Sequence, residues 1–192
     1  MQELKERIRK EGKVLPGNII KVDGFLNHRI DTELMDHIAE EFGKHFNMDE
    51  VTMILTAEAS GIALSAIVAQ HFHKPMIFAK KAKSDNIEGG LYQSDIFSYT
   101  YKKKVTLLVS KEWMSADDKV LIIDDFMANG EAMRGLCDIV TAAGATLVGI
   151  GCAVEKGFQG GGDRLRAAGV NLHSLAIIES AEPGNIVFRG KV

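Results

Sequence analysis

The sequence predicts an α/β fold in which a mostly parallel sheet is flanked by helices. Short aliphatic runs recur along the chain, and segments with helical spacing of apolar residues alternate with them. Two of the runs, at residues 51–56 and 120–123, lead through a loop of small residues into a helix-forming segment. Aliphatic strands without polar alternation are typical of parallel sheets buried on both faces, and the strand–loop–helix order is the unit that builds them.

The composition is that of a globular protein with one substantial core. The chain has 192 residues, of which 46% are hydrophobic and 26% are charged, and its net charge is −3. This charge provides no basic surface for nucleic acid and no polybasic membrane anchor. Residues 1–7 lack the apolar core of a signal peptide, and no apolar run approaches a membrane span. We therefore expect a cytoplasmic protein that forms a single domain over residues 1–192.

The N-terminal part is expected to contain two helices with an irregular segment between them. Residues 2–11 predict a short amphipathic helix that ends at Gly12. Residues 14–25 are apolar but are interrupted by turn residues, which favours a cover over other parts of the fold rather than a core strand. Asp31 is suited to cap a helix over residues 32–46.

The remaining elements follow from aliphatic runs and helical spacing in the rest of the chain. The predicted strands are 51–56, 75–79, 93–100, 104–110, 120–123, 145–154 and 170–178. The predicted helices are 62–72, a helix that begins after Gly130, and a short helix at 163–168. Neither a P-loop nor a dinucleotide-binding glycine motif is present, so the two usual nucleotide-binding folds are unsupported.

The central aliphatic run is followed by residues suited to bind a phosphosugar. Asp124 and Asp125 come directly after residues 120–123, and a loop with Asn129 and Gly130 leads into the next helix. Backbone N–H groups at a helix N-terminus bind anions, and open α/β sheets bind ligands at the carboxyl ends of their strands. Phosphate would lie on the amides, with sugar hydroxyls and a metal on the carboxylates. The alternative is a buried strand whose acidic end only caps the next helix.

A second loop of the same kind follows the run at 51–56. It contains Glu58, Ala59, Ser60 and Gly61, and its small side chains would let backbone amides approach a phosphate closely. The alternative is an ordinary tight turn between a strand and a helix.

Lysines follow the predicted strand at 75–79. Lys80, Lys81 and Lys83 lie at its carboxyl end, on the side where phosphates are expected, although charge runs are usually solvated surface. The polar stretch after them, from Ser84 to Tyr101, contains two adjacent glycines.

Four motifs together resemble the type I phosphoribosyltransferases, and within them the bacterial xanthine branch. The resemblance covers nearly the whole chain, and the motif that begins at Asp124 is its most specific part. The four motifs are Ile20 to Asn27, Glu58-Ala59-Ser60-Gly61, Asp124-Asp125-Phe126-Met127-Ala128-Asn129-Gly130, and Val154-Glu155-Lys156-Gly157-Phe158-Gln159. The resemblance implies the type I fold, with a small hood contributed by about residues 1–30 and 155–192.

The resemblance also implies a reaction and a role for each residue. Such enzymes transfer ribose 5-phosphate from phosphoribosyl pyrophosphate (PRPP) to a purine, with Mg²⁺ held mainly by substrate and water, and they are usually homodimers. Asp124 and Asp125 would be the catalytic residues, because they would bind the ribose hydroxyls and their negative charge would favour the positive sugar ring. The stretch from Ser84 to Tyr101 would be the loop that closes over the site. The PRPP phosphates would be bound by Ala128, Asn129, Gly130, Glu131, Ala132, Glu58, Ala59, Ser60, Gly61, Lys80 and Lys81. The purine would contact Ile20, Asn27 and Lys156.

Two departures from the family pattern bear on the substrate. Asn129 stands where the family usually has Thr, which keeps a hydrogen-bonding side chain but loses the hydroxyl. Ala128 stands where hypoxanthine–guanine enzymes carry an Asp that can act as a base, and in this it resembles adenine and xanthine enzymes. Xanthine ionises near neutral pH and needs less help with its proton. The role of Glu131 is left open, because a Glu at a helix start usually serves the helix dipole.

Two other functions share these motifs. One is an adenine phosphoribosyltransferase, and the other is a non-catalytic, PRPP-sensing regulator of the same fold. Regulators of that kind add a DNA-binding domain or a basic face, whereas this chain is mildly acidic. We therefore expect an enzyme that acts on xanthine and PRPP, with no nucleic-acid or membrane partner.

Overall fold

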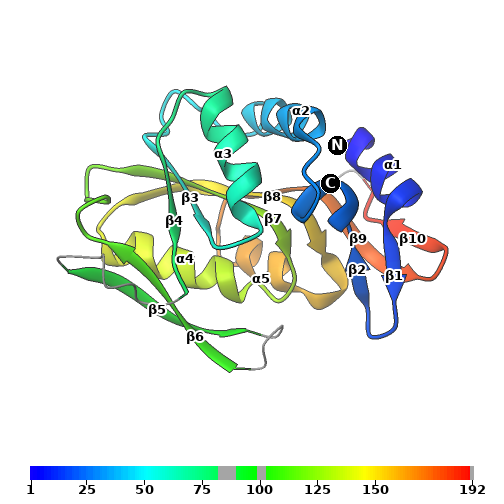
Figure 1. Ribbon diagram of the computed structural model, residues 1–192. Coiled ribbons are helices and arrows are strands. Elements are labelled where there is room, and N and C mark those ends of the chain that lie inside the picture. Colours follow the sequence, from blue (N-terminus) through cyan, green and yellow to red (C-terminus); the bar gives the residue numbers. More distant parts are fainter. Residues whose placement is uncertain (82–89, 99–102, 191–192) are drawn as a thin grey trace.

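The computed structural model describes residues 1–81, 90–98 and 103–190, and a six-stranded sheet forms its centre (Figure 1). The strand order is β10-β9-β8-β7-β3-β4, in which only β10 runs antiparallel to its neighbour. The predicted α/β fold with a mostly parallel sheet is thereby confirmed. The strands are β3 (Met53–Ala57), β4 (Met76–Ala79), β7 (Lys119–Met127), β8 (Thr146–Lys156), β9 (Leu172–Glu182) and β10 (Asn185–Phe188).

Helices cover both faces of this sheet, as Figure 1 shows. Leu121 and Ile123 of β7 pack with α2 and α3 on one face, while Val120 and Ile122 pack with α4 on the other. This explains why the aliphatic run shows no polar alternation. A hairpin of β5 (Leu91–Ser98) and β6 (Lys103–Ser110) packs against α4. The helices are α1 (Gln2–Glu11), α2 (Thr32–Gly43), α3 (Gly61–His71), α4 (Glu131–Ala142) and α5 (Gly161–Ala167).

None of the helices in the described ranges is long and apolar enough to span a membrane.

The segment predicted to be an irregular cover is a hairpin followed by a helical turn. β1 (Lys13–Leu15) pairs antiparallel with β2 (Ile19–Lys21), and the turn η1 (Asp23–Asn27) follows. Gly17 and Asn18 have φ values of 83° and 60°, and these two residue types adopt the left-handed conformation most readily. The prediction of irregular structure was wrong here because strands this short show no periodicity in the sequence.

Strand β7 is longer than predicted and contains both central carboxylates. We expected it to end at residue 123, but it continues to Met127 because β8 runs beside it, with Phe126 opposite Val154. Asp124 and Asp125 therefore lie within the strand, near the carboxyl end at which they were expected. The predicted cap of α2 is confirmed, since the Asp31 carboxylate accepts a hydrogen bond from the Leu34 amide at 3.2 Å.

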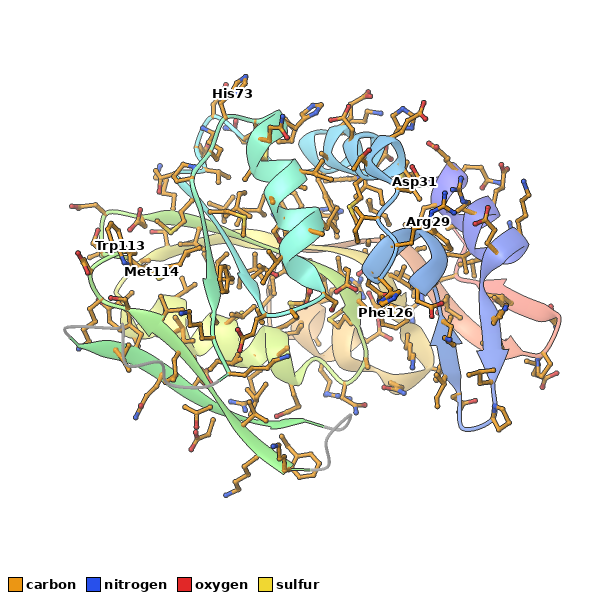
Figure 2. All side chains as sticks on the ribbon, in the orientation of Figure 1. Arg29, Asp31, His73, Trp113, Met114 and Phe126 are labelled. Carbon is orange, nitrogen blue, oxygen red and sulfur yellow. The ribbon has the colours of Figure 1, made fainter. Side chains whose placement is uncertain are left out.

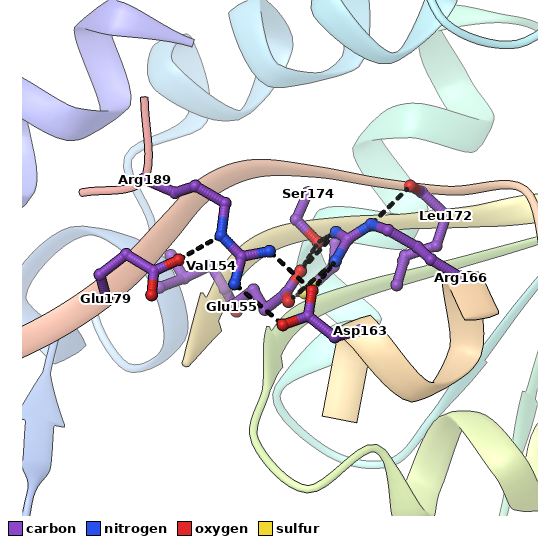
Figure 3. Close-up of polar contacts among 9 residues, drawn as sticks. Val154, Glu155, Asp163, Arg166, Leu172, Ser174, Glu179 and Arg189 are labelled. Carbon is purple, nitrogen blue, oxygen red and sulfur yellow. Dashed lines mark hydrogen bonds and ion pairs between the residues drawn. The ribbon is translucent and has the colours of Figure 1, made fainter. Parts of the chain in front are cut away.

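A network of ion pairs joins α5 to the C-terminal strands (Figure 3). Glu155 is fully buried and accepts hydrogen bonds from the Arg166 guanidinium at 3.1 and 2.6 Å and from the Ser174 hydroxyl. Asp163 contacts the same Arg166 at 3.3 Å and Arg189 at 2.6 and 2.9 Å. The buried carboxylate is thus neutralised by one arginine, which fixes α5 against β8 and β9.

Removing that arginine should destabilise the fold strongly. Arg166→Met leaves the buried Glu155 carboxylate without its cation, and such losses typically cost about 3–5 kcal/mol. Urea unfolding should show this loss. The double variant Glu155→Met/Arg166→Met should recover part of it, because no buried charge remains. Equal stability of the single and double variants would contradict a role for charge pairing.

Candidate active site

A cavity of about 650 Å³ lies at the carboxyl ends of β3 and β7. It brings together most residues that the sequence analysis selected for binding PRPP and purine. Those that line it are Glu58, Ser60, Lys81, Asp124, Ala128, Asn129, Gly130, Glu131, Ala132 and Lys156. The other six, Ile20, Asn27, Ala59, Gly61, Lys80 and Asp125, lie around it and are placed one by one below.

The loop between β7 and α4 presents backbone to the cavity. Gly130 has a φ of 79°, which favours glycine, and α4 begins at the next residue, Glu131. Within the described part of the chain, no side chain caps this helix start, so its first N–H groups are available to a ligand. These groups and the helix dipole favour an anion there. We call residues 128–132 the phosphate loop.

Glu131 has side-chain contacts of its own. Its carboxylate accepts hydrogen bonds from Arg134 at 3.2 Å and from the Phe97 amide at 3.5 Å. It therefore joins the start of α4 to the end of β5, beside the cavity.

Asp124 and Asp125 have different surroundings. The Asp125 carboxylate accepts hydrogen bonds from the Ser60 hydroxyl at 2.8 Å and the Asn27 amide at 2.9 Å. Asp124 is 7% exposed and faces the cavity. Burial, and then the negative charge of Asp125, raise the pKa of Asp124 well above its ordinary value. Asp125 thus joins two segments distant in sequence, while Asp124 is the carboxylate placed to meet a ligand.

Gly61, the first residue of α3, lies directly against Asp124. A Cβ at this position would be 2.3 Å from a carboxylate oxygen of Asp124 and 2.3 Å from the Thr56 hydroxyl. Only glycine allows this approach, so its role is to make room for the carboxylate. Thr56 is fully buried, and its hydroxyl has no hydrogen-bond partner among the described residues.

The loop after β3 is held by its own backbone and by β4. The Glu58 amide donates to the Ala79 carbonyl at 3.0 Å, and the Glu58 carboxylate accepts from the Lys81 amide. The Lys81 side chain lines the cavity, and its charge slightly opposes the raised pKa of Asp124. Ala59 lines a second, smaller hollow beside the cavity, which Lys81 shares. The structure thus places one of the two predicted lysines at the site.

Lys80 has a different position. Its backbone N–H and carbonyl both bond to Leu108 of β6 at 2.9 Å, which joins the hairpin to the edge of the sheet. The prediction for Lys83 lies outside the described residues. Of the stretch 84–101 that was expected to close over the site, residues 84–89 and 99–101 also lie outside them, whereas Leu91–Ser98 form strand β5.

The far end of the cavity combines an aromatic ring with a cation. The Lys156 ammonium lies 5.4 Å from the centroid of the Phe126 ring and donates to the Asn18 carbonyl at 3.0 Å. Half-burial lowers the pKa of Lys156 below its ordinary value. Phe126, labelled in Figure 2, was missed by the sequence analysis, although an aromatic residue directly after Asp124-Asp125 was a visible signal.

The structure places two predicted purine contacts away from the cavity wall. Ile20 is 7% exposed and packs in the hydrophobic core, whereas Ile19 is 51% exposed and lines the cavity. Neighbouring side chains of a strand point to opposite faces, so a shift of one position decides which isoleucine meets the cavity. Asn27 lies near the site, but its amide is bonded to Asp125.

Comparison with known proteins identifies relatives over the whole chain. Residues 25–166 match the model of the phosphoribosyl transferase domain family. The chain is 53% identical over 192 residues to the xanthine phosphoribosyltransferase of Bifidobacterium animalis subsp. lactis. This alignment covers 98% of this chain and 100% of that protein. It is 49% identical over 189 residues to the xanthine phosphoribosyltransferase of Alkaliphilus metalliredigens. That alignment covers 98% of this chain and 94% of the relative.

Solved structures share the fold at lower identity. The adenine phosphoribosyltransferase of Giardia lamblia, complexed with 9-deazaadenine, superposes with a TM-score of 0.78 at 21% identity, covering 93% of this chain and 98% of that one. The adenine phosphoribosyltransferase of Trypanosoma brucei, in complex with AMP, pyrophosphate and ribose-5-phosphate, superposes with a TM-score of 0.72 at 23% identity. The superposition covers 91% of this chain and 79% of that one.

The raised pKa of Asp124 predicts how stability depends on pH. Above the ordinary value of 3.8, the folded protein keeps a proton on Asp124 that the unfolded chain has lost. The free energy of unfolding should therefore fall as pH rises from that value through the raised pKa. Asp124→Asn should flatten this fall in urea unfolding at a series of pH values. The surface variant Asp117→Asn is the control and should keep the wild-type slope. If Asp124→Asn keeps that slope too, the raised pKa of Asp124 is refuted.

Proposed function

The chain belongs to the phosphoribosyltransferase family, and we propose that it transfers ribose 5-phosphate from PRPP to xanthine, giving xanthosine 5′-monophosphate and pyrophosphate. One observation carries this proposal. A single cavity contains an amide-lined helix start, a buried carboxylate and a lysine beside an aromatic ring. These groups suit a phosphate, a ribose and a purine with an oxo group, in that order.

The phosphate loop would hold the 5-phosphate. Residues 128–132 line the cavity at the start of α4, where free backbone N–H groups and the helix dipole attract an anion. Each charge-assisted hydrogen bond is worth about 1.5–3 kcal/mol. This binding energy orients the ribose without taking part in bond breaking.

Asp124 would act on the sugar. Breaking the bond to pyrophosphate leaves positive charge on the ribose, as in glycoside hydrolysis. Asp124 lies in a buried position where ionisation is opposed, so a positive sugar beside it favours the charged carboxylate. The carboxylate therefore gains more in the transition state than in the ground state, which is what accelerates a reaction.

The loop after β3 would receive the pyrophosphate, together with Lys81. Among the described residues, no group of three or more His, Cys, Asp or Glu side chains forms a cage for a metal ion. Glu58 and Asp124 are carboxylates on the cavity wall, and they suit a Mg²⁺ ion that takes most ligands from phosphate oxygens and water. When bound, Mg²⁺ would neutralise charge on the leaving pyrophosphate.

Lys156 and Phe126 would select the base. The Phe126 ring offers a face for a planar purine, and Lys156 can donate to an oxo oxygen and stabilise a xanthine anion. Adenine carries an amino group where xanthine carries its 6-oxo oxygen, so two donors would face each other. Xanthine should therefore be preferred over adenine, because unpaired polar groups are penalised strongly.

Further features of the family remain predictions for this chain. We propose one domain over residues 1–192, with a hood from about residues 1–30 and 155–192. The hairpin β1–β2 supports this, because its turn accepts the hydrogen bond from Lys156. Ile20 and Lys80 are proposed to support the site from outside the cavity, through the core and the backbone bonds to β6. A homodimer and a cytoplasmic location stay predictions.

The reaction and its base preference can be tested together. Pyrophosphate release should be measured with PRPP, Mg²⁺ and each of xanthine, guanine, hypoxanthine and adenine. We expect xanthine to be used best and adenine least. If none of the four purines supports pyrophosphate release, a transferase is refuted and a PRPP-binding regulator remains. A preference for adenine would refute the base assignment.

Lys156→Gln tests the residue that would read the base. We expect a loss of at least about tenfold in kcat/KM for xanthine, since a hydrogen bond to a charged group is worth about 1.5–3 kcal/mol. The KM for PRPP should stay near the wild-type value, because its phosphates bind elsewhere. The surface variant Lys10→Gln is the matched control. Unchanged selectivity of Lys156→Gln for xanthine over adenine would show that this lysine does not read the base.

A further inference from the structure

The first turn of α5 lies directly behind the phosphate loop. A Cβ on Gly161 would be 2.4 Å from the Ala128 carbonyl oxygen, 2.6 Å from the Asn129 carbonyl carbon and 2.7 Å from the Gly130 nitrogen. The backbone of α5 therefore touches three successive residues of the loop, and no side chain fits between them. This contact comes from a glycine-rich segment that the proposed reaction does not otherwise use.

A second contact reaches the same peptide from α5. The Arg164 guanidinium donates to the Asn129 carbonyl oxygen at 3.0 Å and to the Gln159 carbonyl at 3.5 Å. The Asn129–Gly130 peptide is trans, so its carbonyl and N–H point in opposite directions. When Arg164 holds the carbonyl on the α5 side, the Gly130 N–H points away from Arg164, and Gly130 is one of the residues that line the cavity.

We propose that Gly161 and Arg164 are positioning residues that fix the Asn129–Gly130 peptide so that the Gly130 N–H faces the 5-phosphate. This inference rests on the proposed function, which assigns the phosphate loop to that group. A cation on the carbonyl also polarises the peptide and strengthens its N–H as a donor. Neither residue touches the substrate; both act through the loop.

The position of α5 is itself fixed by buried charge. Arg166 of this helix holds the buried Glu155 (Figure 3). A Cβ on Gly162 would lie 2.1 Å from a Glu155 oxygen. Asp163 adds the bond to Arg189 from the C-terminal segment. A helix held in this way is a firm support, so Gly161 and Arg164 place the loop more accurately than a solvated turn could.

Binding of two anions by one protein distinguishes positioning from general stability. Calorimetry with ribose 5-phosphate reports on the phosphate loop, and calorimetry with pyrophosphate and Mg²⁺ reports on the loop after β3. We expect Arg164→Met to weaken ribose 5-phosphate binding about tenfold, which corresponds to one hydrogen bond of about 1.4 kcal/mol. Gly161→Ala should weaken it further, because the Cβ displaces the loop. Pyrophosphate affinity should stay unchanged in both.

Matched variants and a direct spectroscopic signal complete the test. Arg164→Lys keeps a cationic donor and should recover most of the affinity. Gly190→Ala adds a Cβ in open space and should bind like the wild type. In nitrogen-15 NMR spectra, the Gly130 amide should shift on adding ribose 5-phosphate to the wild type, and shift less in Arg164→Met.

The outcomes separate this inference from the function on which it rests. If the wild type binds ribose 5-phosphate and both Arg164→Met and Gly161→Ala bind it equally tightly, the inference is overturned and the proposed function stays intact. Equal losses for both anions would also overturn it, because they would indicate general damage. A wild type that binds no ribose 5-phosphate would refute the assignment of the phosphate loop, and this inference with it. If Gly161→Ala does not fold, Arg164→Met alone decides.

Discussion

Burial of two adjacent carboxylates at the end of the central strand is the constraint around which the site is built. Asp125 is almost fully buried and takes its hydrogen bonds from Ser60 in the loop after β3 and from Asn27 in the N-terminal turn. A buried carboxylate without hydrogen-bond donors lowers the stability of the fold, so the burial of Asp125 requires these two contacts. The carboxylate thereby holds together three segments that are far apart in the sequence. The loop proposed for pyrophosphate and the N-terminal turn η1 meet at the same side chain.

Close backbone approach, made possible by glycine, places the other parts of the site. Gly61 lets the Asp124 carboxylate lie against the start of α3, and Gly162 lets Glu155 lie against the start of α5. Gly161 brings the backbone of α5 against the phosphate loop. In each case a methyl group would overlap a carboxylate or a peptide by a large fraction of an atomic diameter, and tightly packed interiors do not absorb such overlaps. The glycines therefore set distances that longer side chains could not.

The sequence was informative where structure is local and uninformative where it depends on a partner. The parallel sheet, the two strand–loop–helix units and the cap at Asp31 follow from local patterns, and the structure contains all of them. The extension of β7 through Asp124 depends on β8 running alongside, which no pattern in β7 itself reveals. The choice between Ile19 and Ile20 depends on the register of a three-residue strand. The role of the glycines before Arg164 as support for another loop appears only when α5 is packed.

Asp124 illustrates why such a site is made at some cost in stability. Its raised pKa means that the folded protein opposes a charge there, and the neighbouring Asp125 adds to the opposition. A fold selected for stability alone would have an apolar residue in this buried position. The same opposition becomes useful when a ligand brings positive charge, because the interaction is strong in a medium with little water to screen it. The Asp125 backbone N–H and then Lys81 lower the pKa of Asp124, but burial and the charge of Asp125 outweigh them, so the charged carboxylate remains disfavoured in the free protein. In the reaction proposed above, a cationic sugar would satisfy the carboxylate that the free protein destabilises, which favours the transition state over the empty site. The structure of the strand end would in this way serve the chemistry of ribosyl transfer.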